Sequence, residues 1–201
     1  MWKGGNNIYM NIYFDTEFTG LHKNTTLISI GMISEDNKTF YAEFNDYDKS
    51  QVDSWIQRNV IDNLKYNKKE FNEELHEITT VNGNNIFKSR IVGYKDEIKE
   101  ELYEWLSQFD SVELVSDVCH YDMILFIDLF GNAFHIPNNV CPCCYDINQD
   151  ISKKYNITIQ EAFNKSREEI LKENNIEING DKHNSLYDAK VIKEIYKCVK
   201  E

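Results

Sequence analysis

The sequence predicts an α/β domain in which helices flank a mixed central sheet. Three strand-like runs follow one another at residues 11–18, 25–34 and 39–44, and helix-periodic segments dominate the chain after them. One further short strand pattern, at 111–118, lies among the helical segments. Strands that follow each other directly, combined with a later strand between helices, are typical of a layered α/β arrangement.

The first three strand segments are predicted to form a meander. Each is rich in β-branched and aromatic residues, and the polar sequence EDNK at 35–38 provides a tight turn before the third segment. The segment 134–150, far later in the chain, is expected to be irregular.

Helices are predicted at 51–64, 94–109, 121–130, 158–175 and 184–200, from apolar residues that recur at helical spacing. In the first two segments the apolar side is expected to collect Val52, Trp55, Ile56, Val60 and Leu64, and then Ile98, Leu102, Trp105, Leu106 and Phe109.

Size and composition indicate one cytoplasmic domain. A chain of 201 residues with 41% hydrophobic residues can bury a sizeable core, and it lacks an apolar run near the roughly 18 residues of a membrane span. Its five cysteines, without a secretion signal, favour free thiols in a reducing cytosol. Residues 1–10 are predicted to be a flexible leader and residues 11–201 a single domain.

The net charge of −12 argues against a protein that wraps long duplexes, because such proteins are usually basic. An enzyme that acts on a few terminal nucleotides can instead attract phosphate with bound metal ions and a local basic rim. Lys182, Lys190 and Lys193 are candidates for that rim, although lysines on a helix are more often simply solvated. The charge therefore favours short or single-stranded substrates.

Two acids, Asp15 and Glu17, end the first predicted strand. Residues i and i+2 of a strand point to the same face, so these carboxylates should project together and repel each other unless something positive lies between them. A divalent metal, a basic side chain and open water are the alternatives.

Further acids lie at element ends elsewhere in the chain. Asp188 falls near the apolar side of the last predicted helix, where an unpaired carboxylate is costly, and His183 precedes it by five residues. Asp117 ends the later strand and Asp122 opens an apolar helix, so either could join the site, while a plain helix cap remains an alternative for Asp122. Carboxylates that converge from three elements suit Mg²⁺ or Mn²⁺, and a lone histidine beside them suits a general base.

The motifs FDTEFTGL, YDMILF and HNSLYDA, in this order, resemble the three motifs of the DEDDh, or DnaQ-like, 3'-to-5' exonucleases. The likeness covers residues 12–196 and is closer to a compact mycobacterial-type exoribonuclease branch, through the segments around FDTEF, LISIGMIS, Trp55 and VELVSDVCHYDMILF. The sequence departs from the pattern at Val118, where many relatives carry asparagine.

The resemblance implies an RNase H-like fold and a 3'-to-5' exoribonuclease that releases nucleoside 5'-monophosphates with two Mg²⁺ or Mn²⁺ ions per active site. It implies that the metal ligands are Asp15, Glu17, Asp122 and Asp188, with His183 as the base. Asp122 is favoured over Asp117 because the family's second acid follows an aromatic residue, here Tyr121. Phe18, Thr19 and Leu21 are implied to hold the terminal nucleotide, although Phe18 and Leu21 could instead belong to the core.

Alternatives remain open at this point. The enzyme could act on DNA, since no residue reads the 2'-hydroxyl directly, or the chain could be a non-catalytic RNase H-like module or an acidic interaction protein. Members of the family are often homodimers, so a homodimer is an open alternative, but the sequence shows no decisive self-complementary stripe. The sequence CPCC at 141–144 could form a zinc site with Cys119 or His120, but its spacing is unusual for zinc and idle thiols are the preferred interpretation.

Overall fold

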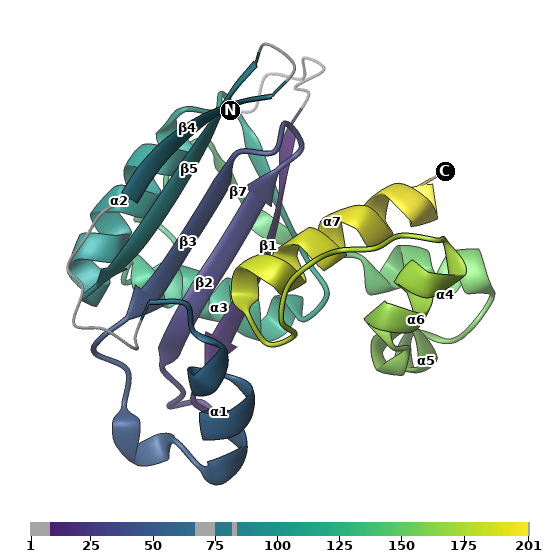
Figure 1. Cartoon of the computed structure of the whole chain (residues 1–201), viewed down its shortest axis with the longest axis horizontal. Helices are drawn as coiled ribbons and strands as arrows, with labels where there is room; N and C mark the ends of the chain where they lie inside the picture. Colours follow the sequence, from purple (N-terminus) through teal and green to yellow (C-terminus); the bar gives the residue numbers. More distant parts are fainter. Residues whose placement is uncertain (1–8, 67–74, 82–83, 201) are drawn as a thin grey trace.

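A seven-stranded sheet forms the centre of the protein in a computed structural model that describes residues 9–66, 75–81 and 84–200, with the backbone alone between 75 and 90. The strand order is β4-β5-β3-β2-β1-β6-β7, and Figure 1 shows β5, β3, β2 and β1 side by side. The strands are β1 Met10–Phe18, β2 Leu27–Ser34, β3 Thr39–Phe44, β4 Leu75–Val81, β5 Asn84–Gly93, β6 Val112–Ser116 and β7 Val140–Asp146. The helices are α1 Ser54–Asn59, α2 Lys95–Ser107, α3 Cys119–Leu129, α4 Asn148–Tyr155, α5 Ile159–Asn164, α6 Arg167–Glu173 and α7 Ser185–Lys200.

The sheet is mixed, as predicted. The meander β1-β2-β3 is antiparallel, and β4 pairs antiparallel with β5. In contrast, β5 runs parallel to β3, β6 runs parallel to β1, and β7 runs parallel to β6. β1 therefore lies between an antiparallel and a parallel neighbour near the middle of the sheet.

Helices cover both faces of the sheet. Helices α2 and α3 pack on one face, and α7 crosses the other, with α4, α5 and α6 gathered beside α7 (Figure 1). Along β1, Ile12 and Phe14 belong to the core under α2 and α3, whereas Tyr13 belongs to the core under α7. Because side chains alternate along a strand, Asp15 and Glu17 share the face that α7 covers.

The start of α7 lies directly against β2 at Gly31. A Cβ atom on Gly31 would be 2.2 Å from the backbone nitrogen of Leu186 and 2.3 Å from the carbonyl carbon of Ser185. Gly31 is also the residue paired with Asp15 across the β1–β2 ladder. The missing side chain therefore lets the first turn of α7 approach the acidic end of β1.

The helix predicted at 51–64 is too long, and one residue assigned to its buried side is exposed. Helix α1 spans only Ser54–Asn59, between 3-10 turns at Lys49–Gln51 and Ile61–Asn63. The carboxylate of Asp53 accepts hydrogen bonds from the first free N–H groups of α1, which sets its start. Ile56 is buried as predicted, but Trp55 is 51% exposed and points away from the core.

Two later expectations also need correction. The segment 134–150 is not wholly irregular, because β7 forms the edge of the sheet, where a proline such as Pro142 is tolerated beside a register shift. The single helix predicted at 158–175 is two helices, α5 and α6, separated at Lys165 and Ser166, and Ser166 caps α6. α4 and the strands β4 and β5 were not predicted, whereas α2, α3, β6 and α7 match their predicted positions closely.

The predicted leader and domain boundary lie mostly outside the described residues. Residues 1–8 are not described, and β1 begins at Met10, which is within the predicted leader. Among the described residues, no helix combines the length and the apolar character that crossing a bilayer requires.

We predict that Gly31→Ala lowers the free energy of unfolding by about 3 kcal/mol, because the added methyl group meets backbone that cannot move alone. Urea denaturation measures this loss. Gly131→Ala is the matched control, since a Cβ there meets no atom within 4 Å and its φ of 87° adds only a local backbone cost of about 1–2 kcal/mol. Equal losses in the two variants would contradict the close approach of α7.

Candidate active site

Asp15 and Glu17 place two carboxylates together near the carboxyl end of β1. Both side chains are half-buried. Burial raises the pKa of Asp15 well above its ordinary value, and the charges of Asp122 and Glu17 raise it further. Burial also raises the pKa of Glu17, followed by the charge of Asp188. The end of β1 is therefore a centre of concentrated negative charge.

Asp122, in the first turn of α3, is fixed against the end of β1 by hydroxyl groups. Its Oδ1 accepts hydrogen bonds from the hydroxyl and the backbone N–H of Thr16, at 2.6 Å and 3.2 Å, and its Oδ2 accepts one from the hydroxyl of Ser116. The side chain is almost completely buried. Burial raises the pKa of Asp122 to about 7, although the hydrogen bonds from Ser116 and Thr16 oppose that rise.

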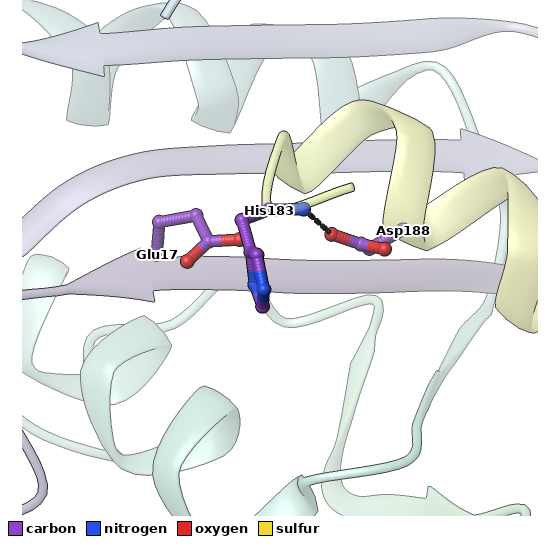
Figure 2. Close-up of side chains that lie close together, drawn as sticks. All are labelled: Glu17, His183 and Asp188. Carbon is purple, nitrogen blue, oxygen red and sulfur yellow. Dashed lines mark hydrogen bonds between the residues drawn. The ribbon is translucent and has the colours of Figure 1, made fainter. Parts of the chain in front are cut away.

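Asp188 and His183 come from α7 and from the loop before it. The backbone N–H of His183 donates to Oδ2 of Asp188 at 2.9 Å, and Figure 2 shows both residues beside Glu17. His183 has a φ of 61°, in the left-handed region that a residue with a Cβ seldom adopts. Burial, and then the charge of Asp117, raise the pKa of Asp188 to about 7. The strained loop thus holds the imidazole next to two carboxylates.

The ring of His183 packs edge-on against Trp55, with ring centroids 5.1 Å apart. Burial, and then the charge of Lys182, lower the pKa of His183 below its ordinary value. The imidazole is therefore neutral near pH 7 and has a free lone pair that can accept a proton. Sequence reasoning missed this role of Trp55, because helical periodicity assigned the residue to the core.

The potential metal ligands form two groups of three residues each. The ligand atoms of Glu17, His183 and Asp188 lie within 4.8 Å of one another, and so do those of Asp15, Asp117 and Asp122. The structure therefore brings together all five predicted catalytic residues and adds Asp117, which the sequence offered only as an alternative to Asp122. Closely spaced oxygen donors with raised pKa values fit Mg²⁺ or Mn²⁺, because hard cations prefer carboxylates and would offset their repulsion.

The three residues predicted to bind substrate lie in different environments. Phe18 stacks on Tyr121, with ring centroids 5.1 Å apart, and Leu21 is 75% exposed. Thr19 is buried, and its backbone N–H donates to the carbonyl of Thr26 at 3.0 Å. Leu21 can therefore meet a ligand through its side chain, whereas Phe18 also packs against the core and Thr19 shapes the loop between them.

The cysteine candidates and Lys193 do not extend the site. The sulfur atoms of Cys119 and Cys144 are 2.7 Å apart, but within the described part of the chain no thiol belongs to a group of three or more metal ligands. Lys193 is buried, and its ammonium donates to the carbonyl groups of Ser34 and Glu35, so it cannot contribute to a basic rim. Lys182 pairs with Glu168 at 2.9 Å.

Comparison with known protein families shows to which family this chain belongs. Residues 10–199 match the family described as the 3'-5' exoribonuclease Rv2179c-like domain. The chain belongs to this family. The 3'-5' exoribonuclease Rv2179c of Mycobacterium tuberculosis strain H37Rv is 27% identical over 133 residues, which are 65% of this chain and 67% of the relative. A protein named 3'-5' exoribonuclease MT2234.1, from strain CDC 1551, matches equally well.

Two solved structures share the fold of this chain. The nuclease domain of 3'hExo, a DEDDh family member bound to rAMP, has a TM-score of 0.62 at 13% identity, covering 98% of this chain and 93% of that one. Pop2p of S. pombe, in a Mg²⁺- and Mn²⁺-bound form, has a TM-score of 0.57 at 14% identity, covering 96% and 83%. These matches confirm the predicted RNase H-like fold.

We predict that Mn²⁺ stabilises the protein more at a pH of about 8 than at about 5.5. Asp122 and Asp188 have folded pKa values of about 7, above the value of about 4 in an unfolded chain, so their protonation stabilises the fold at low pH and this contribution disappears as the pH rises through 7. Mn²⁺ competes with those protons and should restore the stability at high pH.

Melting temperatures in EDTA and in MnCl₂ at both pH values measure the effect. Asp188→Asn, which removes one of the two carboxylates, is the control and should reduce the pH dependence of the Mn²⁺ shift. A shift that is absent, or equal at both pH values, would contradict a cation site in the acidic cluster.

Proposed function

We propose that this protein is a metal-dependent 3'-to-5' exoribonuclease that hydrolyses phosphodiester bonds from the 3' end and releases nucleoside 5'-monophosphates. Membership in a family described by that activity supports the proposal. The observation that carries it is the meeting of four carboxylates and one imidazole at the end of β1: Asp15, Glu17, Asp122, Asp188 and His183.

The relatives support both RNA and a divalent cation. The mycobacterial relative is named as an exoribonuclease, one structural neighbour is described as recognising the 3' end of a histone mRNA stem-loop, and another is described as binding Mg²⁺ and Mn²⁺. The acidic surface of this chain, with a net charge of −12, further favours single-stranded or short RNA 3' ends over long duplexes.

The carboxylates are proposed to hold two Mg²⁺ or Mn²⁺ ions, with Asp15, Glu17, Asp122 and Asp188 as ligands. When bound, such cations activate the attacking water and stabilise the leaving 3'-oxygen. The carboxylates cannot relieve their mutual repulsion by moving apart, because Asp122 and Asp188 are held in place by hydrogen bonds from Thr16, Ser116 and His183.

His183 is proposed to take the proton of the attacking water. Its lowered pKa keeps the ring neutral, and its contacts with Trp55 and Asp188 restrict its position. Phe18 and Leu21 are proposed to contact the terminal nucleotide, and Thr19 to hold the loop that presents them. The exposed side chain of Leu21 offers an apolar surface to a base.

Residues 11–201 are proposed to be one domain, because the sheet and both of its helical layers draw on elements from β1 to α7. A cytoplasmic location is proposed from the five cysteines, all of which are free thiols in the structure. A homodimer remains a prediction.

Digestion of 5'-labelled and 3'-labelled RNA and DNA of the same sequence, with Mg²⁺, Mn²⁺ or EDTA, tests the function. We expect stepwise shortening of 5'-labelled RNA from its 3' end, release of 5'-monophosphates, and no reaction in EDTA or with Asp15→Asn purified in parallel. DNA cleaved faster than RNA would instead indicate an exodeoxyribonuclease. No metal-dependent cleavage of either polymer would leave a non-catalytic module as the better description.

His183→Gln is expected to lower kcat by about 10²- to 10⁴-fold, because it removes the proton acceptor, while Mn²⁺ binding is retained. Single-turnover cleavage and calorimetric Mn²⁺ titration measure the two properties. Loss of Mn²⁺ binding in this variant would contradict the role of a base and make His183 a metal ligand.

Leu21→Ala is expected to raise KM several-fold with little change in kcat or in melting temperature, because the side chain is 75% exposed and outside the core. Phe134→Ala, which truncates a 95% exposed side chain beyond the far end of α3, is the control and should change neither constant. Unchanged KM in Leu21→Ala would remove this residue from the substrate contact.

A further inference from the structure

A sixth side chain, Asp117, lies at the candidate active site without a role in the function proposed above. It follows β6 and precedes α3. One ligand atom of Asp117 lies within 4.8 Å of ligand atoms of both Asp15 and Asp122. The carboxylate is only 13% exposed, so it is part of the enclosed acidic cluster and not of the solvated surface.

Arg167, at the start of α6, is bonded to Asp117. Its Nε donates to Oδ2 of Asp117 at 2.7 Å, and its side chain is 15% exposed. The contact uses one nitrogen and one oxygen, whereas a bidentate pair would occupy both carboxylate oxygens. Among the described residues, no side chain donates a hydrogen bond to Oδ1 of Asp117, so the contact with Arg167 leaves this oxygen able to bind a further partner.

The remaining nitrogen atoms of Arg167 fix its orientation. One terminal nitrogen donates to the carbonyl groups of Ala162 and Lys165, both at 3.0 Å, and the other donates to the side-chain oxygen of Asn148 at 2.8 Å. Asn148 is buried and in turn donates to the backbone carbonyl of Asp117 at 2.7 Å. The break between α5 and α6 therefore supplies the acceptors that hold Arg167 on Asp117.

This arrangement differs from a salt bridge that only joins two elements. A bridge between α6 and the sheet could lie anywhere along their contact, but this one lies where its carboxylate adds a further negative charge beside Asp15 and Asp122. Arg167 offsets part of that charge and prevents the side chain from rotating away. A carboxylate that lies beside other acids and is anchored through one oxygen by a hydrogen-bond donor is typical of a supported metal ligand.

We propose that Asp117 is an additional carboxylate of the cation site formed with Asp15 and Asp122, and that Arg167 is the residue that positions it. The inference rests on the function proposed above, because it assigns these residues to the same metal-dependent site. It extends that site from three elements of the chain to a fourth, since α6 now supports a ligand. The ligand is a hard divalent cation, Mg²⁺ or Mn²⁺.

Calorimetric titration with Mn²⁺ tests this inference without relying on activity. We expect Asp117→Asn to weaken one class of Mn²⁺ site by about 10- to 100-fold, as loss of a supporting or direct ligand does. Arg167→Gln should weaken the same class by a smaller factor. The double variant should bind Mn²⁺ no more weakly than Asp117→Asn alone, because the arginine acts only through the aspartate.

Asp128→Asn is the matched control. It removes the same charge from an exposed acid, 67% exposed and paired with Lys95 near the end of α3, and should leave Mn²⁺ affinity unchanged. Asp117→Asn conserves the shape of the side chain and an oxygen for Arg167, and a melting temperature verifies that the variant folds. If it nevertheless unfolds, Arg167→Gln supplies the comparison, and parental Mn²⁺ affinity in that variant would overturn the inference.

Parental Mn²⁺ affinity in Asp117→Asn would overturn the inference and leave Asp117 as a structural partner of Arg167. The proposed function fails separately: a parent chain that binds Mn²⁺ but does not cleave nucleic acid would refute the nuclease, while the ratio of Mn²⁺ affinities would still decide the role of Asp117. A parent chain that binds no Mn²⁺ would overturn both.

Discussion

Repulsion among closely spaced carboxylates is the constraint on which the rest of this structure depends. Asp15, Glu17, Asp122 and Asp188 come from β1, α3 and α7, and burial raises the pKa of each of them. Left alone, such an assembly favours protonation or separation of the side chains, and both would destroy a hydrolytic site. A fold that keeps these groups together therefore requires cations to complete it.

Several local features make sense as supports for that assembly. Gly31 has no side chain, and so α7 can begin directly against the strand that pairs with Asp15. Thr16 and Ser116 hold Asp122 with hydroxyl groups, which orient a carboxylate without adding charge. The left-handed backbone of His183 turns its N–H toward Asp188 and leaves its ring beside Trp55. Each feature lowers local stability or conformational freedom and in return fixes the position of a ligand.

The sequence predicted the parts of this arrangement that follow from periodicity and motif. Alternation along a strand was enough to place Asp15 and Glu17 together, and the apolar face of the last helix was enough to place Asp188 near the core. The residues alone left Asp117 and Asp122 as alternatives at one strand-to-helix junction, and the resemblance favoured Asp122, whereas the structure brings both to the site. The sequence misplaced Trp55, since the cap at Asp53 shortens α1, and it missed β7, whose edge position tolerates Pro142. Arg167 reaches the site only through tertiary packing of α6, for which no local pattern exists.

The location of bound cations tests this account most directly. Crystals of the protein soaked in MnCl₂ and measured near the manganese absorption edge would reveal each ion by its anomalous scattering. The account predicts two peaks within coordination distance of the carboxylates at the end of β1, one on the side of Asp15 and Asp122 and one on the side of Glu17 and Asp188. Peaks elsewhere on the surface, with none at the end of β1 under saturating Mn²⁺, would contradict it.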